Sequence, residues 1–271
     1  MEKLHRNERI STMMKILSDS PNRIMTLSYF CELFGTAKST MSEDVDILQK
    51  TVKLFDLGEI GTVTGASGGV FFRPVISREK TLRFLNGLCE KLSGTERVLP
   101  GGFLYYSDIL SAPEIVKTMG EIIAGEYYES APDFVLTMET KGIPVAFATA
   151  TALGVPLVIA RHSSKVYEGS AVNINYVSGS GNIETMSLSR RAVREGQKAL
   201  IVDDFLKGGG TAKGMEDLMH EFRVGVVGSA FVMATASPSK KRIEGEKALM
   251  TLEIVGDEKD TALVRPSEWL K

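Results

Sequence analysis

A strand that ends in two acids and runs into a glycine-rich turn is the feature of this sequence that most constrains its fold. Residues 199–202 are apolar, Asp203 and Asp204 follow them, and a helix-like run begins at Thr211. The turn between the acids and the helix contains Lys207, Gly208, Gly209 and Gly210. A glycine-rich turn before a helix directs backbone N–H groups at an anion, and the acids can accept hydrogen bonds from sugar hydroxyls. We therefore expect an α/β domain that binds a phosphorylated sugar at this turn.

The same segment is also compatible with an ordinary strand–loop–helix unit whose acids are solvated at the end of a strand. Other nucleotide-binding motifs are missing, since the sequence has neither G-x-x-x-x-G-K-[ST] nor a G-x-G-x-x-G after a strand. The three histidines, His5, His162 and His220, are scattered and give no metal-ligand spacing. We expect no metal site made by the protein alone.

Composition indicates a globular intracellular protein. The chain has 271 residues, 43% of them hydrophobic, which is enough for two domains with separate cores. Its net charge is −2, so contact with DNA has to come from a local patch. Cys31 and Cys89 are too few for a disulfide framework. Without a signal peptide or an apolar run of the ~18 residues that cross a bilayer, we expect a cytoplasmic protein with no membrane partner.

Residues 1–74 predict an N-terminal winged helix-turn-helix domain. Apolar residues recur at helical spacing in three segments, Ile10–Leu17, Thr26–Phe34 and Ala37–Val52. Gly35 lies in the turn between the second and the third segment, which is the helix-turn-helix layout. The runs 59–64 and 70–73 then flank a glycine-rich tip, as in a β-hairpin.

The first turn of the second helix in such a unit meets base edges in the major groove of DNA. Here that turn has small hydroxyl groups and one cation, and further cations lie near the N-terminus. We predict a DNA face made of Lys3, Arg6, Arg9, Lys38, Ser39, Thr40 and Ser42, with Gly65 and Gly68 in the wing.

Charge leaves a second interpretation of this domain open, a small helical module without a nucleic-acid role. Residues 1–74 contain nine Lys or Arg and nine Asp or Glu, and Glu43, Asp44 and Asp46 lie on the candidate recognition helix. One winged helix with balanced charge neutralises few phosphates. If the domain binds DNA, we expect it to do so as a homodimer.

Residues 75–271 predict a second domain of alternating strands and helices. Continuous apolar strands at 134–138 and 157–160, with a helix at 143–153 between them, indicate a parallel sheet with helices on both faces. Ligands bind at the carboxyl ends of the strands in such sheets. The loop after the first strand contains Thr140, Lys141 and Gly142, and it is a second candidate anion site at this edge.

The segment from 161 to 191 predicts a hairpin that covers the ligand. Two alternating runs, 171–177 and 183–188, flank a turn rich in serine and glycine. Such a hairpin is flexible enough to close over a site as a lid.

The acids and the glycine-rich turn resemble the signature of the type I phosphoribosyltransferases, which bind phosphoribosyl pyrophosphate (PRPP). The loop at 139–142 looks like their pyrophosphate loop, although the signature usually has Thr- or Ser-type residues where this chain has Lys207 and Gly208. With a winged helix in front, the whole chain resembles the purine operon regulators (PurR) of Gram-positive bacteria. In these a winged helix is fused to a catalytically silent phosphoribosyltransferase domain. The resemblance includes LPGG at 99–102 before an expected aromatic strand at 103–106.

The resemblance implies a type I phosphoribosyltransferase-like sheet and PRPP as the effector, with Mg²⁺ carried by the ligand. It places the ribose at the two acids, the 5′-phosphate at the glycine-rich turn and the pyrophosphate at the 139–142 loop. The predicted effector residues are Thr140, Lys141, Gly142, Tyr176, Asp203, Asp204, Phe205, Lys207, Gly208, Gly209, Gly210 and Thr211. A family aromatic residue near the effector falls at Phe103 or at Tyr105.

Tyr176 stands near the place where the adenine phosphoribosyltransferases have a Glu-Tyr pair that handles the base. The turn after it, 177–182, holds no acid to act on a purine, so we expect no enzyme activity. Three functions stay open: a regulator that responds to PRPP, an active purine phosphoribosyltransferase with an accessory N-terminal domain, and a bifunctional protein. The winged helix and the acid-free turn favour a DNA-binding transcriptional regulator of purine biosynthesis genes. Its expected partners are double-stranded DNA, PRPP and a second copy of itself.

Overall fold

The computed structural model describes residues 4–65, 68–101, 103–164, 169–179, 181–255 and 261–270. The chain forms two compact units, one comprising Met1–Ser77 and Thr151–Gly154 and the other Arg78–Ala150 and Val155–Lys271. Each unit has a hydrophobic core of its own.

The first unit has the winged helix-turn-helix fold that the sequence predicts. Its elements are α1 (Arg6–Asp19), α2 (Leu27–Phe34), α3 (Lys38–Leu54) and the antiparallel strands β1 (Glu59–Val63) and β2 (Gly69–Arg73). Thr26 caps α2 by accepting a hydrogen bond from the N–H three residues on (3.1 Å), and Gly35 ends the helix with a left-handed φ of 61°. The apolar faces of the helices and the hairpin meet at a core that includes Phe30, Met41 and Val70.

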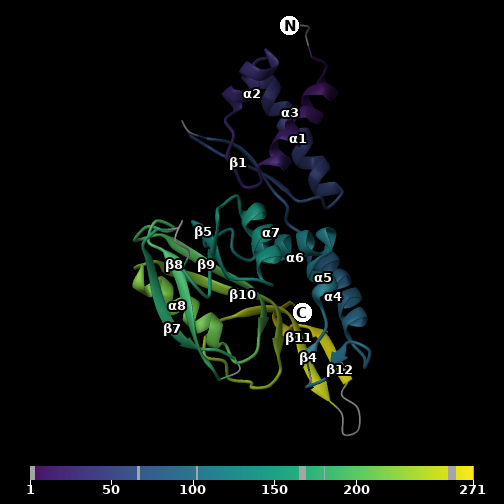
Figure 1. Ribbon diagram of the computed structural model, residues 1–271. Coiled ribbons are helices and arrows are strands. Elements are labelled where there is room, and N and C mark those ends of the chain that lie inside the picture. Colours follow the sequence, from purple (N-terminus) through teal and green to yellow (C-terminus); the bar gives the residue numbers. More distant parts are fainter. Residues whose placement is uncertain are drawn as a thin grey trace. The chain divides into compact units, whose positions relative to one another are not determined.

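The second unit is built on a six-stranded sheet in the order β12-β11-β10-β9-β5-β6 (Figure 1). Neighbouring strands are parallel except for β11 and β12, which are antiparallel. The strands are β5 (Phe134–Met138), β6 (Leu157–Ala160), β9 (Lys198–Leu206), β10 (Gly225–Thr235), β11 (Lys247–Val255) and β12 (Thr261–Pro266). The predicted parallel sheet is confirmed, with one antiparallel strand added at its edge.

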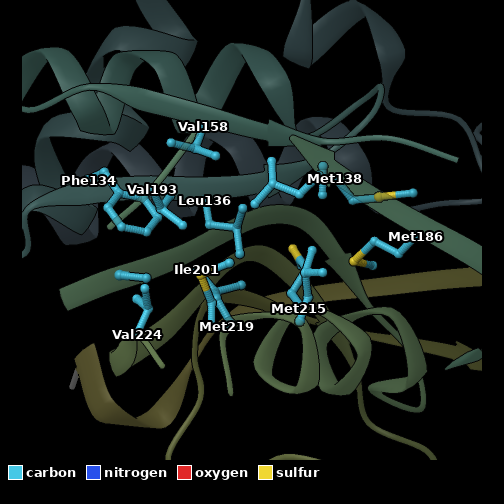
Figure 2. Packing of buried hydrophobic residues seen from close by; sticks show 14 of the residues in the cluster. Phe134, Leu136, Met138, Val158, Met186, Val193, Ile201, Met215, Met219 and Val224 are labelled. Carbon is cyan, nitrogen blue, oxygen red and sulfur yellow. The ribbon is translucent and has the colours of Figure 1, made fainter. Parts of the chain in front are cut away.

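Helices lie on both sides of this sheet (Figure 1). The helix α8 (Gly210–Glu221) covers one side, and the other side carries α4 (Arg78–Leu92), α6 (Pro113–Gly125) and α7 (Ile143–Leu153). Figure 2 shows the core between the sheet and α8, where Met215 and Met219 lie close to Ile201 of β9. Every residue of β5 is buried, which explains its unbroken apolar sequence. A short 3-10 helix, η2 (Glu268–Leu270), follows the last strand.

The predicted hairpin is present as β7 (Ala171–Val177) and β8 (Ile183–Ser189), and it packs on α8. Two glycines of α8 allow this close approach. A side chain at Gly210 would collide with the carbonyl oxygen of Val177, and one at Gly214 would press against the ring of Tyr176, 3.0 Å away. The hairpin is therefore packed directly against the helix that follows the glycine-rich turn.

The expected aromatic strand over 103–106 is confirmed at Phe103 but is wrong for Tyr105 and Tyr106. The segment forms a short hairpin of β3 (Val98–Leu99) and β4 (Phe103–Leu104), and Tyr106 is already the N-cap of α5 (Ser107–Leu110). Arg97 holds this helical turn through two hydrogen bonds to the Asp108 carboxylate (2.8 and 2.9 Å). The strand ends before Tyr106 because α5 begins at Ser107, and the Tyr106 side chain is buried.

Candidate functional site

The acid pair, Asp203 and Asp204, lies beside the loop that follows β5. β9 pairs directly with β5, and the parallel register aligns Ile201 with Leu136. The carboxyl ends of both strands therefore reach the same edge of the sheet. The approach is close, because a side chain on Gly142 would collide with the Asp203 carboxylate. The fold brings together two segments that the sequence indicated separately.

Both acids are almost fully buried, with exposed fractions of 7% for Asp203 and 9% for Asp204. Oδ1 of Asp203 accepts a hydrogen bond from the Asp204 N–H (2.9 Å). Burial and, after it, the neighbouring Asp204 charge raise the pKa of Asp203 well above its usual value. Such a pair can accept hydrogen bonds from ligand hydroxyls, and a carboxyl that keeps its proton can also donate one.

Tyr106 is a site residue that the sequence analysis missed in favour of its aromatic neighbours. Its hydroxyl donates a hydrogen bond to Oδ2 of Asp204 (2.6 Å). Its ring stacks on Phe205 with the centroids 5.9 Å apart, and Nζ of Lys141 lies 5.0 Å from its centroid. Burial and the negative charge of Asp204 raise the pKa of Tyr106. The contact joins residues 98 positions apart in the chain, so no local pattern could have indicated it.

A cavity of about 900 Å³ opens beside these side chains. Of the predicted effector residues, Lys141, Phe205 and Lys207 line it. Phe103 and Tyr106 add aromatic surface, whereas neither carboxylate of the acid pair is among the described residues that line the cavity. Tyr106 thus contacts both the cavity and the carboxylate to which it is hydrogen-bonded.

The glycine turn, Lys207–Thr211, is tied to a downstream segment that the sequence did not single out. Nζ of Lys241 donates to the carbonyl oxygen of the first turn residue (2.6 Å), and the N–H of Arg242 donates to that of the second (3.1 Å). Gly209 is the N-cap of α8 and has a left-handed φ of 81°, which glycine adopts without strain. The first N–H groups of a helix have no acceptor within the helix, so the start of α8 is suited to an anion.

The loop after β5 presents its cation to the cavity. Thr140 and Lys141 are exposed, and Gly142 is buried against the acid pair. The Glu139 carboxylate anchors the start of the loop by accepting a hydrogen bond from the His162 N–H (2.7 Å). The peptide bond that begins this loop, between Glu139 and Thr140, is cis.

Tyr176, a predicted effector residue, is buried in the core of the second unit with an exposed fraction of 6%. Its hydroxyl donates to Oε2 of Glu184 (2.9 Å) and is also hydrogen-bonded to Thr211 of the glycine turn. Burial raises the pKa of Tyr176 to about 12. The ring points away from solvent because β7 packs this face against α8, where Gly214 leaves room for it. Tyr176 is not among the described residues of the cavity wall, and its link to the predicted site runs through Thr211.

The β7–β8 hairpin contains an acid, although its turn at 177–182 has none. Glu184 lies directly opposite Tyr176 in the β7–β8 register, two residues beyond the turn at which the sequence search stopped. Hydrogen bonds from Ser178 and Tyr176 lower the pKa of Glu184, and Nδ1 of His162 lies 3.7 Å from its carboxylate. Glu184 is therefore held as an ionised carboxylate whose oxygens are engaged within the hairpin.

Most of the predicted DNA face lies at the surface of the first unit. Four predicted residues lie in the first turn and a half of α3. Lys38, Ser39 and Ser42 are exposed, and Thr40 is half-buried. Gly65 and Gly68 lie in the wing between β1 and β2, and Lys3 is outside the described residues. Arg6 is exposed and forms an ion pair with Glu43 on α3 (2.8 Å).

Arg9 lies in the interior of the first unit. Its exposed fraction is 8%, its Nε lies 2.7 Å from Oδ2 of the fully buried Asp44, and its Nη1 donates to the Leu4 carbonyl oxygen (2.9 Å). A guanidinium that is desolvated and paired in this way is not free to reach a phosphate. We therefore remove Arg9 from the predicted DNA face, and Asp44 adds no negative charge to it.

Three further features bear on what the chain can bind. The Thr137 hydroxyl, buried on β5, has no hydrogen-bond partner within the described residues. No group of three or more His, Cys, Asp or Glu in the described ranges is arranged to hold a metal ion. In the part of the chain that the structure covers, no helix is both long and apolar enough to cross a membrane.

Comparison with known proteins agrees with this two-part architecture. The family model described as "Bacterial purine repressor, N-terminal" matches residues 5–74, and that of the "Phosphoribosyl transferase domain" matches residues 105–265. The chain is 42% identical over 250 residues to a "Probable purine biosynthesis transcriptional regulator PurR" of Streptococcus pneumoniae, which covers 92% of this chain and 91% of that protein. It is 37% identical over 270 residues to the "Purine biosynthesis transcriptional repressor PurR" of Bacillus subtilis, covering 99% of this chain and 95% of that protein.

A solved structure supports the fold of the second unit. The adenine phosphoribosyltransferase of Thermoanaerobacter pseudethanolicus superimposes with a TM-score of 0.52 over 65% of this chain and 98% of that one. The two sequences are 20% identical, and at that level the likeness concerns the fold alone.

Proposed function

We propose, for a chain that belongs to the PurR family of transcriptional regulators of purine biosynthesis, that PRPP bound in its second unit controls DNA binding by its first. DNA-binding regulation of purine biosynthesis genes follows from the family. The effector, the homodimer and the lack of catalysis are our proposal. The observation that carries the effector is the meeting of the acid pair with the Lys141 loop at one edge of the sheet.

The residues at this edge match the chemistry of PRPP. Asp203 and Asp204 can accept hydrogen bonds from the ribose hydroxyls, while Lys207 and the first N–H groups of α8 attract the 5′-phosphate. Lys141 attracts the pyrophosphate, and the unpartnered hydroxyl of Thr137 adds a polar group close to Gly142. Mg²⁺ would arrive with the ligand, whose pyrophosphate oxygens chelate it and whose charge it partly neutralises. The protein then needs cations and groups that accept hydrogen bonds from hydroxyls, rather than a complete metal site. The two lysines and the two acids named above supply these groups.

The DNA side of the proposal rests on the exposed start of α3. Lys38, Ser39 and Ser42 are exposed and offer one cation and two hydroxyl groups to a major groove. A homodimer would place two such helices on one operator and double the number of phosphate contacts. DNA as the partner also implies a cytoplasmic location for the protein.

Catalytic silence is supported by the state of Glu184. Transfer to a purine needs an acid or base that can reach the base nitrogen. Glu184 is the hairpin's candidate, yet its oxygens already accept hydrogen bonds from Tyr176 and Ser178, and it is not among the described residues that line the cavity. The same Tyr176–Glu184 pair is the observation that favours the alternative, an active purine phosphoribosyltransferase. Incubation with Mg²⁺, PRPP and each purine base separates the two, because formation of nucleotide and pyrophosphate would overturn our proposal.

The test of the effector site is a titration of DNA from upstream of purine biosynthesis genes, with and without Mg²⁺–PRPP. We expect PRPP to change the affinity of the wild type and to have little effect on Asp203→Ala. Loss of the carboxylate leaves a ligand hydroxyl unpaired, which reduces affinity for PRPP roughly five- to 150-fold. DNA affinity in the absence of PRPP should be retained, because Asp203 belongs to the second unit.

The matched control is Asp217→Ala on α8, an exposed acid that pairs with Lys213 and lies outside the predicted site. Its response to PRPP should equal that of the wild type. A response of wild-type sensitivity in Asp203→Ala would show that the pocket lies elsewhere.

The homodimer is tested by light scattering at micromolar protein. We expect a mass of twice the chain's 29.5 kDa. A mass near that of one chain, unchanged when DNA is added, would contradict the dimer.

A further inference from the structure

We infer that the hydroxyl of Tyr106 occupies the position at Asp204 that a ligand hydroxyl takes, so that Tyr106 selects which ligands reach the acid pair. The inference rests on the proposed function, since it concerns the same site. It adds a specificity-determining residue that lies outside the predicted effector set.

The first support is the geometry of the contact. The hydroxyl of Tyr106 donates to Oδ2 of Asp204 over 2.6 Å, the length expected when a hydroxyl donates to a carboxylate. The exposed fraction of Tyr106 is 8% and that of Asp204 is 9%, so the bond is shielded from water. A ribose hydroxyl that donates to the same oxygen would make the same bond. The phenol thus mimics the ligand group for which the carboxylate is suited.

The second support is the position of the ring relative to the cavity. Tyr106 lines the cavity, and neither acid of the pair is among the described lining residues. A ligand in this cavity therefore contacts the Tyr106 side chain, whose hydroxyl is bonded to Asp204. Because the Tyr106 hydroxyl already occupies this acceptor position of Oδ2, a ligand hydroxyl that takes the same position has to displace the phenol.

The third support is the pair of side chains that contact the Tyr106 ring. Tyr106 stacks on Phe205 and lies under the Lys141 ammonium, and both of those residues also line the cavity. Release of the phenol therefore rearranges the groups that we assign to the ligand.

This arrangement makes the acid pair selective for ligands that carry a hydroxyl. Opening the contact leaves a buried carboxylate without its donor, and a ligand hydroxyl can restore that bond whereas a ligand group without a donor cannot. Pyrophosphate has no such hydroxyl and can bind at Lys141 without displacing the phenol. The hydrogen bond of Tyr106 should therefore weaken the binding of PRPP and leave the binding of pyrophosphate unaffected.

The experiment is calorimetric titration of full-length wild type and Tyr106→Phe with Mg²⁺–PRPP and, separately, with Mg²⁺–pyrophosphate. Phenylalanine keeps the ring and its stacking and removes only the competing hydroxyl. We expect Tyr106→Phe to bind PRPP about tenfold more tightly, the size of one net hydrogen bond, and pyrophosphate within about twofold of the wild type. The matched control is Tyr29→Phe, which removes an exposed tyrosine hydroxyl from the first unit and should bind both ligands as the wild type does.

Each other outcome overturns the inference. Unchanged or weaker binding of PRPP by Tyr106→Phe would mean that the phenol stays on Asp204 in the complex and supports the ligand. Equal tightening for PRPP and pyrophosphate would mean that the phenol shields the whole cavity rather than one acceptor oxygen. In both cases binding of PRPP to the wild type leaves the proposed function intact. Failure of the wild type itself to bind PRPP would overturn the proposed function and this inference with it.

Discussion

The guanidinium of Arg9 and the carboxylate of Asp44 form an ion pair in the interior of the winged helix, with Nε 2.7 Å from Oδ2. The pair joins α1 to α3 across 35 residues of sequence. Asp44 is fully buried, and its second oxygen lies 3.4 Å from Nε of Arg6. The contact fixes the helix that carries the proposed DNA face, and it gives Arg9 a structural role.

Replacing Arg9 by alanine should destabilise the winged helix. Without Arg9, the buried Asp44 carboxylate keeps only the exposed Arg6 as a cation among the described ion pairs, and breaking a buried pair typically lowers the free energy of unfolding by about 3–5 kcal/mol. We expect a fall of that order in the free energy of unfolding of the first unit, measured by chemical denaturation. Lys15→Ala removes an exposed cation paired with Asp19 and should cost about 0.5 kcal/mol or less.

The double variant Arg9→Met, Asp44→Leu distinguishes a lost charge partner from lost packing. Because it removes both charges, it should recover much of the stability that the single alanine variant loses. If the double variant is as unstable as Arg9→Ala, the carboxylate left behind is not the cause of the loss.

Lys38 at the start of α3 should contact a DNA phosphate. Lys38→Ala is expected to weaken binding similarly for operator and unrelated DNA, and to flatten the dependence of log affinity on log salt by about one. The control is Lys50→Ala, an exposed lysine near the other end of the same helix. DNA affinity is measured by fluorescence anisotropy over a salt series. Equal losses of affinity in both variants would indicate a diffuse electrostatic attraction instead of a phosphate contact by Lys38.

Asp203 should make stability depend on pH. Its pKa is raised in the folded protein, chiefly by burial, so the folded state retains a proton that the unfolded chain releases once the pH exceeds the ordinary carboxyl value. Stability from this group is therefore lost as the pH rises through the interval between the two pKa values. The asparagine in Asp203→Asn carries no charge at any pH. The stability of this variant should therefore exceed that of the wild type by a small amount at about pH 4 and by a larger amount at about pH 8. Thermal melts at both pH values check this, and an equal gain at each would contradict it.

Gly142 should not accept a side chain. In alanine, the Cβ would collide with the Asp203 carboxylate and lie 2.7 Å from the Thr137 hydroxyl. We expect Gly142→Ala to lose about 1–3 kcal/mol of stability and to weaken the response to PRPP, because the acid pair must shift.

Gly87→Ala is the control for this substitution. Gly87 lies within α4, and nothing lies within 4 Å of the Cβ that alanine would add. Alanine is the better helix former, so this variant should be more stable by up to about 1 kcal/mol. Urea denaturation of both variants measures the two free energies of unfolding. A Gly142→Ala variant as stable as the wild type would show that the surrounding side chains can move to accommodate the methyl group.

Local patterns predicted most elements well, for reasons visible in particular residues. The helix predicted over 143–153 is α7 with the same ends, and the strand predicted over 134–138 is β5. Their boundaries are marked by Gly142 before the helix and by an unbroken apolar run in the strand. The strand expected over 103–106 ends at Leu104. Tyr105 and Tyr106 were misread because aromatic residues favour strands, while the helical turn at Ser107 is held by a contact between Arg97 and Asp108.

The sequence by itself determined the order of the elements and the edge of the sheet at which Asp203, Asp204 and Lys141 come together. Periodicity and the rule for the ends of parallel strands are local or topological, so they can be applied without coordinates. Only the tertiary structure decided which charged and polar side chains are buried and with whom they pair. Arg9 meets Asp44, Tyr176 meets Glu184, and Tyr106 meets Asp204. These contacts depend on desolvation and packing between segments far apart in the chain or on opposite strands of a hairpin, and no short stretch of sequence carries that information.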